Sequence, residues 1–378
     1  MSNVYLVQDK ELKMAGQGDE KIFNFSYAPR GPRKRNFRVK FRKVACYNTD
    51  DINKYLSGHK MEYAREQIQA FDVILRHQAS NSMIINGRNF FAPGQQGKDL
   101  GSGREVFAGY SQSCRAIQGN SGGTLALNID TAAAAFLKQL PVIEFAAEVI
   151  NPRDGIRELS GRNFWQDWKR KSVEQSIKGV MLVATHLKGK QGQDQKTWRC
   201  NSLSREGAGR TQFELTDDKT GRVTKVTVAD YYAKHYGIRL KYPDAPCIVN
   251  GSPKNPDRVK YFPMELMKIA PRQAHKGKLD EKMTSNMIRA VATPAPERQQ
   301  RTNQVAKKAI DNASEKAKDF GIKINAEMEK VNGRVLDAPK LDYKKQVSAL
   351  CISHAACYIC FLGSGKWRRS KTRCVGYP

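Results

Sequence analysis

An aromatic and basic cluster between residues 186 and 262 holds the side chains of this sequence that are best suited to ligand chemistry. Its members are His186, Lys196, Trp198, Phe213, Tyr231, His235, Tyr236 and Phe262. Aromatic faces stack on unpaired bases, which contributes about 1–3 kcal/mol per base. Hydroxyl, imidazole and ammonium groups donate hydrogen bonds to phosphate oxygens. By residue type alone, such rings belong to a protein core more often than to a ligand site. The cluster therefore indicates a surface for single-stranded RNA, with core packing as the alternative.

A basic run extends from Arg30 to Lys43 and contains eight Lys or Arg residues. Within it Phe37, Val39 and Phe41 alternate with basic residues, which predicts a strand with one apolar and one basic face. A basic face can follow the phosphates of RNA, and it can equally be a solvated surface or a nuclear-import-like patch. The candidate contacts to an RNA backbone are Arg33, Lys34, Arg35, Arg38 and Lys40.

A cysteine-rich tail contains four residues of the types that bind zinc, namely Cys351, His354, Cys357 and Cys360. Thiolate and imidazole groups suit Zn²⁺, but two-knuckle sites separate their ligand pairs by a longer loop than this tail offers. We therefore expect no metal and no other cofactor. No Ser-His-Asp or Cys-His arrangement has a spacing that favours nucleophilic catalysis.

The charge of the chain makes a polyanion the expected partner. Its 378 residues include 65 Lys or Arg against 37 Asp or Glu, a formal net charge of +28. Nucleic acid is the usual polyanion that neutralises such an excess, and an anionic membrane surface is the alternative. No apolar run is long enough to span a bilayer, so we expect no membrane partner. Sparse cysteines without a secretion signal indicate a reducing compartment, and we expect the cytoplasm and also the nucleus.

Periodicity predicts the elements that must position these side chains. Residues 62–77 have an apolar stripe typical of a helix, and the alanine run 132–138 predicts a short helix after Asp130 and Thr131. Val228–Tyr236 predicts a helix that places Tyr231 and Tyr236 on nearby turns. Further helices are expected over 284–292 and 297–320. Strands separated by turns favour a small β-barrel with attached helices; they are residues 180–184, 197–200, 224–228 and 246–249.

Three segments around the cluster resemble the PAZ domain of Argonaute proteins. They are Thr227-Val-Ala-Asp-Tyr-Tyr-Ala-Lys-His-Tyr236, Leu240-Lys-Tyr-Pro-Asp-Ala-Pro246 and Tyr261-Phe-Pro-Met-Glu-Leu266. The resemblance implies an α+β multidomain chain with an α/β N-terminal domain. It also implies a PAZ domain in which an OB-like β-barrel carries an αβ insertion, with the RNA end held between them.

Other motifs, in the order of the family, resemble the neighbouring Argonaute domains. Asp72-Val-Ile-Leu-Arg-His77 is similar to the N-terminal domain, Leu100-Gly-Ser-Gly-Arg-Glu-Val106 to the first linker, and Met287-Ile-Arg-Ala290 to the second linker. The implied division is 1–20 disordered N-terminus, 21–98 N-terminal domain, 99–140 linker 1, 141–273 PAZ domain, 274–343 linker 2 and 344–378 unrelated cysteine-rich tail.

The resemblance also implies roles for the cluster in binding an RNA 3′ end. Tyr231, Tyr236 and His186 match phosphate-binding residues of the family, and Phe213 matches the ring that stacks on the terminal base. The other four members depart from the family or match it only by residue class. Lys196 stands at a basic position, Trp198 at a position that usually carries Tyr, His235 where Lys is common, and Phe262 at an apolar position beside the base.

The implied function is small-RNA binding in gene silencing, with the PAZ domain anchoring the 3′ end of a microRNA- or siRNA-like guide. The implied partners are single-stranded small RNA, duplexes with 3′ overhangs, and Dicer-type loading machinery. In the family, cleavage belongs to the PIWI domain, and the resemblance ends at Tyr343, so we expect no enzymatic activity from this chain. The alternative is that the sequence is the incomplete N-terminal part of a full-length Argonaute that cleaves RNA. A third hypothesis is a fragment that competes for guide RNA or loading partners.

Overall fold

The structure is a computed structural model of the chain. It describes residues 20–27, 35–42, 46–119, 122–150, 155–160, 167–187, 196–216, 223–251, 259–330, 336, 340–341 and 349–350. Arg33, Lys34 and the candidate zinc ligands of the tail lie outside the described residues. The chain divides into two compact units, residues 1–117 with 123–327 and residues 118–122 with 328–378.

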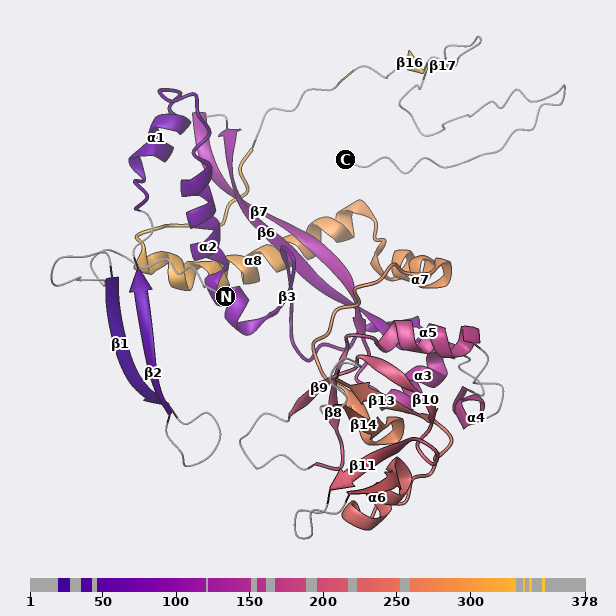
Figure 1. The fold of residues 1–378 in the computed structure, drawn as a ribbon. Coiled ribbons are helices and arrows are strands. Elements are labelled where there is room, and N and C mark those ends of the chain that lie inside the picture. The colour runs from indigo at the N-terminus through magenta and orange to yellow at the C-terminus, as the bar shows by residue number, and fades with distance from the viewer. Residues whose placement is uncertain are drawn as a thin grey trace. The chain divides into compact units, whose positions relative to one another are not determined.

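The larger unit begins with an antiparallel hairpin of β1 (Glu20–Tyr27) and β2 (Arg35–Arg42) (Figure 1). The predicted alternation is present, because Phe25 lies opposite Phe37 on one face and Asn24 opposite Arg38 on the other. The Phe25 and Phe37 rings stack with centroids 5.6 Å apart. Both rings remain more than a third exposed, at 49% and 38%, so the hairpin carries an apolar face that the described residues do not bury.

A five-stranded sheet follows two helices, α1 (Asp50–Leu56) and α2 (Arg65–Ser82). The strand order is β3-β4-β6-β5, and β7 pairs with β6. The strands are β3 (Ile84–Asn86), β4 (Asn89–Phe91), β5 (Lys98–Gly101), β6 (Arg104–Gly119) and β7 (Gly122–Leu137). Phe136 packs against Phe107 and Phe91, with ring centroids 4.4 and 5.1 Å apart, and these rings fix the sheet's core.

The helix expected over residues 132–138 does not form, because most of these residues belong to β7. Ala135, Phe136 and Leu137 are all buried, and the Leu137 N–H donates to the Gln273 carbonyl at 2.9 Å. The helix preference of alanine is worth less than about 1 kcal/mol per residue. Aromatic packing and strand pairing outweigh that preference here.

Two three-stranded antiparallel sheets make up the region expected to form a β-barrel, in the orders β15-β8-β9 and β10-β13-β14. Their strands are β8 (Met181–Ala184), β9 (Thr197–Arg199), β10 (Ser202–Gly207), β13 (Pro246–Asn250), β14 (Lys260–Pro263) and β15 (Met267–Ile269). Over the described residues both sheets are open, so the OB-like arrangement is built from two open sheets and not from a closed barrel. The 3₁₀ turn η3 (Met264–Leu266) carries the chain from one sheet to the other, and the register of β10 on β13 shifts between Leu203 and Gly207.

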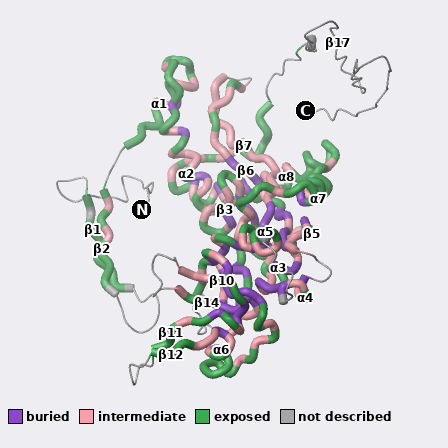
Figure 2. The backbone as a smooth tube through the Cα atoms, turned by 45° about the vertical axis from the view of Figure 1, so that its right-hand side comes forward, coloured by how far each residue is buried: buried purple, intermediate pink, exposed green. Residues whose placement is uncertain are grey.

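The two open sheets share one hydrophobic core. Leu182 of β8, Ile248 of β13 and Met267 of β15 are fully buried in the same cluster. Phe145, also fully buried, contributes from the helix that covers them. The helices of this region are α3 (Val142–Ile150), α4 (Gly155–Ser160) and α5 (Asp167–Ile177). Figure 2 shows buried backbone concentrated near α3, β10 and β14, whereas β1 and β2 are mostly exposed.

An αβ insertion projects between β10 and β13, as the resemblance implied. It consists of the antiparallel pair β11 (Gln212–Thr216) and β12 (Val223–Thr227), followed directly by α6 (Val228–Tyr236). Val228 and Tyr232 of α6 are buried with Ala208 and Cys247, so one face of α6 is fixed to the sheets.

Two helices end the larger unit, α7 (Glu281–Val291) and α8 (Ala295–Asp319). Ala309, Ala313 and Ala317 of α8 are fully buried, and Ala313 and Ala317 lie in one cluster with Leu75 of α2. Small side chains at this spacing allow the two helices to approach closely. No helix in the described ranges is both long and apolar enough to cross a bilayer.

The smaller unit contains a short antiparallel pair among its described residues. Its strands are β16 (Lys340–Leu341) and β17 (Ala349–Leu350), in which Lys340 pairs with Leu350 and Leu341 with Ala349.

Candidate nucleic-acid interface

Helix α6 carries three of the predicted site residues, and both of its ends are fixed by local sequence. The Thr227 hydroxyl oxygen accepts from the Asp230 N–H at 3.1 Å, which satisfies a free donor of the first turn. Gly237 ends the helix with φ +67°, a left-handed conformation that favours glycine. The helix therefore presents Tyr231, His235 and Tyr236 from a defined backbone.

A ring cluster forms where α6 meets the bend after β8 and strand β11. We use this name for His186, Phe213, Tyr231, Tyr232, His235 and Tyr236. The His186 ring lies 5.0 Å from the Tyr236 ring, and the Tyr231 and Tyr236 rings lie 5.9 Å apart, measured between centroids. Phe213 contacts Tyr231 edge to face at 5.3 Å. The structure thus brings together five of the eight residues that the sequence selected.

His186 is held in place by the residue before it. The Thr185 N–H and hydroxyl both donate to the Leu266 carbonyl, at 2.9 and 3.0 Å. Burial lowers the pKa of His186, and a hydrogen bond with the Leu266 backbone opposes that shift. In the free chain His186 is therefore mostly uncharged at neutral pH, and a nearby phosphate would favour its protonated form.

Tyr231 and Tyr232 of the ring cluster remain protonated at neutral pH. Burial, and then the neighbouring Tyr236, raises the pKa of Tyr231. Burial also raises the pKa of Tyr232 well above its usual range. Tyr236 is 40% exposed, whereas Tyr232 is buried and packs against the other rings.

The remaining three predicted residues form a separate group on β9, on β14 and at the residue directly before β9. We call Lys196, Trp198, Lys260 and Phe262 the Trp198 group. The Lys196 and Lys260 ammonium nitrogens lie 4.4 and 4.9 Å from the centre of the Trp198 ring. Phe262 is buried, and its ring lies 4.9 Å from that of Trp198. Two cations and an indole therefore meet at one place.

Two buried ring nitrogens at this interface have no hydrogen-bond partner within the part of the chain that the structure describes. They are Nδ1 of His186 and Nε1 of Trp198. A buried polar atom without a partner destabilises a protein by about 1–3 kcal/mol, so such atoms call for an explanation. One lies in the ring cluster and the other in the Trp198 group, and a ligand's acceptor atoms could satisfy both.

Sequence reasoning missed Tyr232 and Lys260. Tyr232 lies four residues before Tyr236 on α6, so the helical period places both on one face, with rings 5.3 Å apart. Lys260 lies two residues before Phe262 on β14, so the strand period places both on one face. Both could have been found from these periods once the elements were known.

The basic residues of the N-terminal run lie on another element, the β1–β2 hairpin. Arg38 and Lys40 are exposed on β2, and Lys40 pairs with Glu20 at 2.6 Å. Arg35 begins β2, and nothing is described of its side chain. Partial neutralisation of Lys40 favours the interpretation of a solvated strand face for that residue.

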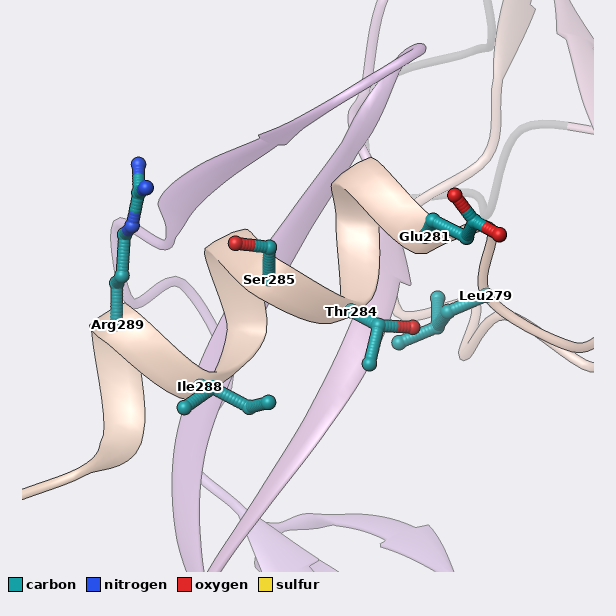
Figure 3. A pocket seen from close by; sticks show the side chains of 6 residues that line it. All are labelled: Leu279, Glu281, Thr284, Ser285, Ile288 and Arg289. Atoms are coloured by element: carbon teal, nitrogen blue, oxygen red, sulfur yellow. The ribbon is translucent and has the colours of Figure 1, made fainter. Parts of the chain in front are cut away.

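No residue of the ring cluster lines either of two cavities among the described residues. A hollow of 540 Å³ runs along α7, where side chains such as Glu281, Thr284 and Arg289 spread along the helix rather than converge (Figure 3). A larger cleft of 1010 Å³ lies between β8, the segment 272–280 and the start of β6. Among the described residues, no group of His, Cys, Asp or Glu has the arrangement of a metal site.

Three family models match this chain in consecutive segments. The PAZ domain model matches residues 153–288, the Argonaute linker 1 domain residues 86–138, and the Argonaute linker 2 domain residues 297–343. The PAZ match contains the whole ring cluster and the whole Trp198 group.

Solved structures of Argonaute proteins resemble this chain. Kluyveromyces polysporus Argonaute with a guide RNA is 15% identical over 84% of this chain and 35% of its own, with a TM-score of 0.46. The Drosophila Ago-PAZ domain in complex with 3′-end 2′-O-methylated RNA is 26% identical, over 35% of this chain and 99% of its own, with a TM-score of 0.28. The Drosophila Argonaute 2 PAZ domain, described for 3′-end recognition of nucleic acids, is 26% identical over 36% and 98%, with a TM-score of 0.25. The chain spans about a third of the length of the Kluyveromyces protein.

Proposed function

The chain belongs to the Argonaute family, and on that premise we propose that its PAZ domain binds the 3′ end of single-stranded RNA. The observation that carries this proposal is the convergence of His186, Tyr231 and Tyr236. Tyr231 and Tyr236 belong to α6, whereas His186 follows β8. The centroid of the Tyr236 ring lies 5.0 Å from that of His186 and 5.9 Å from that of Tyr231. Tyrosine hydroxyls beside an imidazole that can gain a proton suit phosphate oxygens.

Each part of the interface has its own task in this proposal. Tyr231, Tyr236 and His186 donate hydrogen bonds to the terminal phosphates. Phe213 offers its face to the last base, because every base has an aromatic face and stacking tolerates any sequence. In the Trp198 group, the indole Nε1–H donates to the ligand, and Lys196 and Lys260 supply charge next to it. His235 stacks on Tyr231 at 5.1 Å and holds that ring in position.

Replacing the two phosphate-binding tyrosines by phenylalanine tests the proposal while leaving the rings in place. Tyr231→Phe with Tyr236→Phe removes only two hydroxyls. Hydrogen bonds to charged groups contribute about 1.5–3 kcal/mol each, so we expect the affinity for single-stranded RNA to fall about a hundredfold. Fluorescence anisotropy with a labelled RNA measures this loss, and circular dichroism checks that the fold persists.

A matched control lies elsewhere in the chain. Tyr55 and Tyr63 also form a ring contact, at 5.3 Å, and Tyr55→Phe with Tyr63→Phe should leave RNA affinity unchanged. Equal affinities of both double variants and the parent chain would reject the proposed site.

We further propose that this chain binds RNA without cleaving it, since the matched segments are the PAZ domain and the two linkers. Incubating the chain with Mg²⁺, a guide and a labelled complementary RNA tests this, and a discrete cleavage product would contradict it. The alternative is that these residues act within a full-length Argonaute that cleaves RNA. The RNA-binding role is common to both.

The finer parts of the function remain proposals too. We propose microRNA- or siRNA-like guides and 3′-overhang duplexes as ligands, Dicer-type loading machinery as a partner, and action in gene silencing in the cytoplasm. Arg38 is proposed as a secondary contact to the RNA backbone. The domain limits given by the resemblance, with linker 1 at 99–140 and the PAZ domain at 141–273, are likewise proposed.

A further inference from the structure

A cleft of 1010 Å³ lies outside the ring cluster and has no assigned role. We call it the basic cleft. Its walls come from the start of β6, the end of α5, the first residues of β8, the last residue of β9 and the segment 272–280. These elements belong to the larger unit.

Positive charge dominates the lining of the basic cleft. Six of its residues are Lys or Arg, and Asp280 is the one carboxylate among the residues that line it. The carboxylate already accepts the Met283 N–H at 2.7 Å as the N-cap of α7. No ion pair involves any of the six within the described part of the chain. The six are Arg104, Lys178, Arg199, Arg272, Lys276 and Lys278.

A buried guanidinium forms the floor of the basic cleft. Arg104 is only 4% exposed, yet its Nε has no hydrogen-bond partner within the described residues. One terminal nitrogen donates to the Ser102 carbonyl, and the guanidinium lies 5.4 Å from the centre of the Phe145 ring. Burial lowers the pKa of Arg104, and nearby Asp280 opposes the shift. A buried cation with an unpaired donor lowers the stability of the folded chain unless an anion binds next to it.

Hydrogen bonds connect the segments around Arg104. The Gln273 side chain bonds both backbone groups of Met181, each at 2.8 Å, and so ties the segment 272–280 to β8. The N–H of Gly103, the residue before Arg104, donates to the Glu148 carboxylate at 2.8 Å. Among the described residues other than glycine, only Ser102 and Arg272 have positive φ, at 51° and 64°, and both line this cleft. Strained backbone of this kind is typical of functional sites.

The basic cleft is distinct from the 3′-end site, although the same strand pair reaches both. At the cleft, Met181 of β8 pairs with Arg199 of β9. Further along β8, Val183 pairs with Thr197, and Val183 precedes His186 by three residues. Strands rise about 3.3 Å per residue, so β8 alone separates its two ends by about 10 Å. No residue of the ring cluster or of the Trp198 group lines the cleft.

We propose that the basic cleft is a second binding site, specific for clustered phosphate groups, with Arg104 as its buried anchor. Guanidinium groups match phosphate oxygens in a bidentate manner, and three of the six cations are arginines. Phosphate oxygens would satisfy the free Nε of Arg104, while Arg272, Lys276 and Lys278 close over the anion from the exposed rim. The phosphates can belong to a nucleic-acid backbone or to a small polyphosphate, which present the same chemistry to the cleft.

Removing the charge of the exposed rim tests this site without touching its buried floor. The variant is Arg272→Gln with Lys276→Gln and Lys278→Gln in the full chain. Its matched control removes the same charge from the exposed face of α8, as Lys307→Gln with Lys308→Gln and Lys318→Gln. The probes are inorganic tripolyphosphate, followed by calorimetry, and single-stranded RNA, followed by anisotropy over a range of salt concentrations.

We expect the rim variant to bind tripolyphosphate about tenfold more weakly than the control variant, because hydrogen bonds to charged groups are lost at three positions. If RNA displaces tripolyphosphate, the natural phosphates are those of a strand. The salt slope of RNA binding should then fall by about 2, at roughly 0.7 per phosphate contact. If RNA does not displace it, the site serves a small polyphosphate. Equal tripolyphosphate affinities of the rim and control variants would overturn the proposal.

The Tyr231→Phe and Tyr236→Phe chain separates this site from the 3′-end site. We expect it to bind tripolyphosphate as tightly as the parent chain does. A matching loss of tripolyphosphate affinity in that variant would assign the anion to the ring cluster and would also overturn the second site.

Discussion

At the scale of single residues, the interface is defined by polar atoms that the protein itself leaves without partners. Nδ1 of His186 and Nε1 of Trp198 are both buried and unpaired among the described residues. A core histidine or tryptophan usually finds a partner for such an atom. The unpaired atoms therefore distinguish these rings from ordinary core residues, a distinction that residue type alone did not provide.

Trp198→Phe should separate binding from stability. The change keeps a ring between the two lysines but removes the unpaired Nε1–H. The lost packing is offset by relief of an unsatisfied donor, so we expect the free energy of unfolding to change by less than about 1 kcal/mol. RNA affinity should fall about tenfold, which corresponds to about 1.4 kcal/mol.

Trp168→Phe provides the control for that variant. Trp168 is 62% exposed on α5, and Lys169 lies 5.5 Å from its ring, so it is also a tryptophan beside a cation. Denaturant unfolding and RNA anisotropy should show no loss of affinity. A Trp198→Phe chain that binds RNA as tightly as the parent would exclude the indole N–H as a ligand contact.

The stability of the chain should depend on pH through two partly buried imidazoles. Burial lowers the pKa of His186, and burial followed by nearby Arg104 lowers that of His275. Both groups therefore bind a proton more readily in the unfolded chain, where the pKa of histidine is about 6.5. Their contribution to stability is therefore complete above that pH and is lost as the pH falls below it.

The measurement is the midpoint of urea unfolding at several pH values, from weakly acidic to neutral. His186→Asn with His275→Asn should flatten the rise in stability, whereas His77→Asn, which changes an exposed residue of α2, should not. A steep rise that persists unchanged in the double variant would contradict the burial argument.

At the scale of elements, the ring cluster depends on α6, which carries four of its six residues. Both ends of this helix could be predicted from the sequence. The helix predicted over Val228–Tyr236 has the same limits in the structure. Thr227 and Gly237 are standard capping residues, so local chemistry sets both ends. The other half of the cluster was not predictable in this way, since His186 reaches α6 only through the contact of Thr185 with Leu266.

Gly237→Ala tests the C-terminal cap of α6. A Cβ at this position would meet no atom within 4 Å, but φ is +67°. The penalty is therefore conformational, and we expect about 1 kcal/mol of lost stability in urea unfolding. Gly209→Ala is the control, because its φ is ordinary and its Cβ would make a normal 3.6 Å contact with Pro243. Equal stabilities of the two variants would show that the left-handed cap does not matter.

The same scale explains where prediction from sequence failed. Residues 132–138 contain an alanine run with helical propensity, yet Phe136 is held between Phe91 and Phe107 and forces a strand. The strands between 180 and 249 were predicted nearly at their observed positions, but their division into two open sheets was not. That division involves η3, which links the two sheets, and the irregular register of β10, and no local pattern encodes either.

At the scale of the whole molecule, the excess of positive charge acts at several separate places. The charge of +28 predicted a polyanionic partner, but the structure divides the cations among the Trp198 group, the basic cleft and the β2 face. The order of short motifs along the chain predicted the family. Pairing of distant segments, such as 272–280 with the ends of β7 and β8, created the basic cleft, which sequence periods did not reveal.

The most direct test of the central claim compares two forms of one RNA. A linear single-stranded oligonucleotide has a 3′ end, whereas its circularised form has the same bases and phosphates but no end. If the ring cluster holds a 3′ end, the chain should bind the linear RNA at least about tenfold more tightly at the same salt concentration, and Tyr231→Phe with Tyr236→Phe should abolish the difference. Equal affinities of the parent chain for the linear and circular RNAs would contradict the account, because they would show that only charge is recognised.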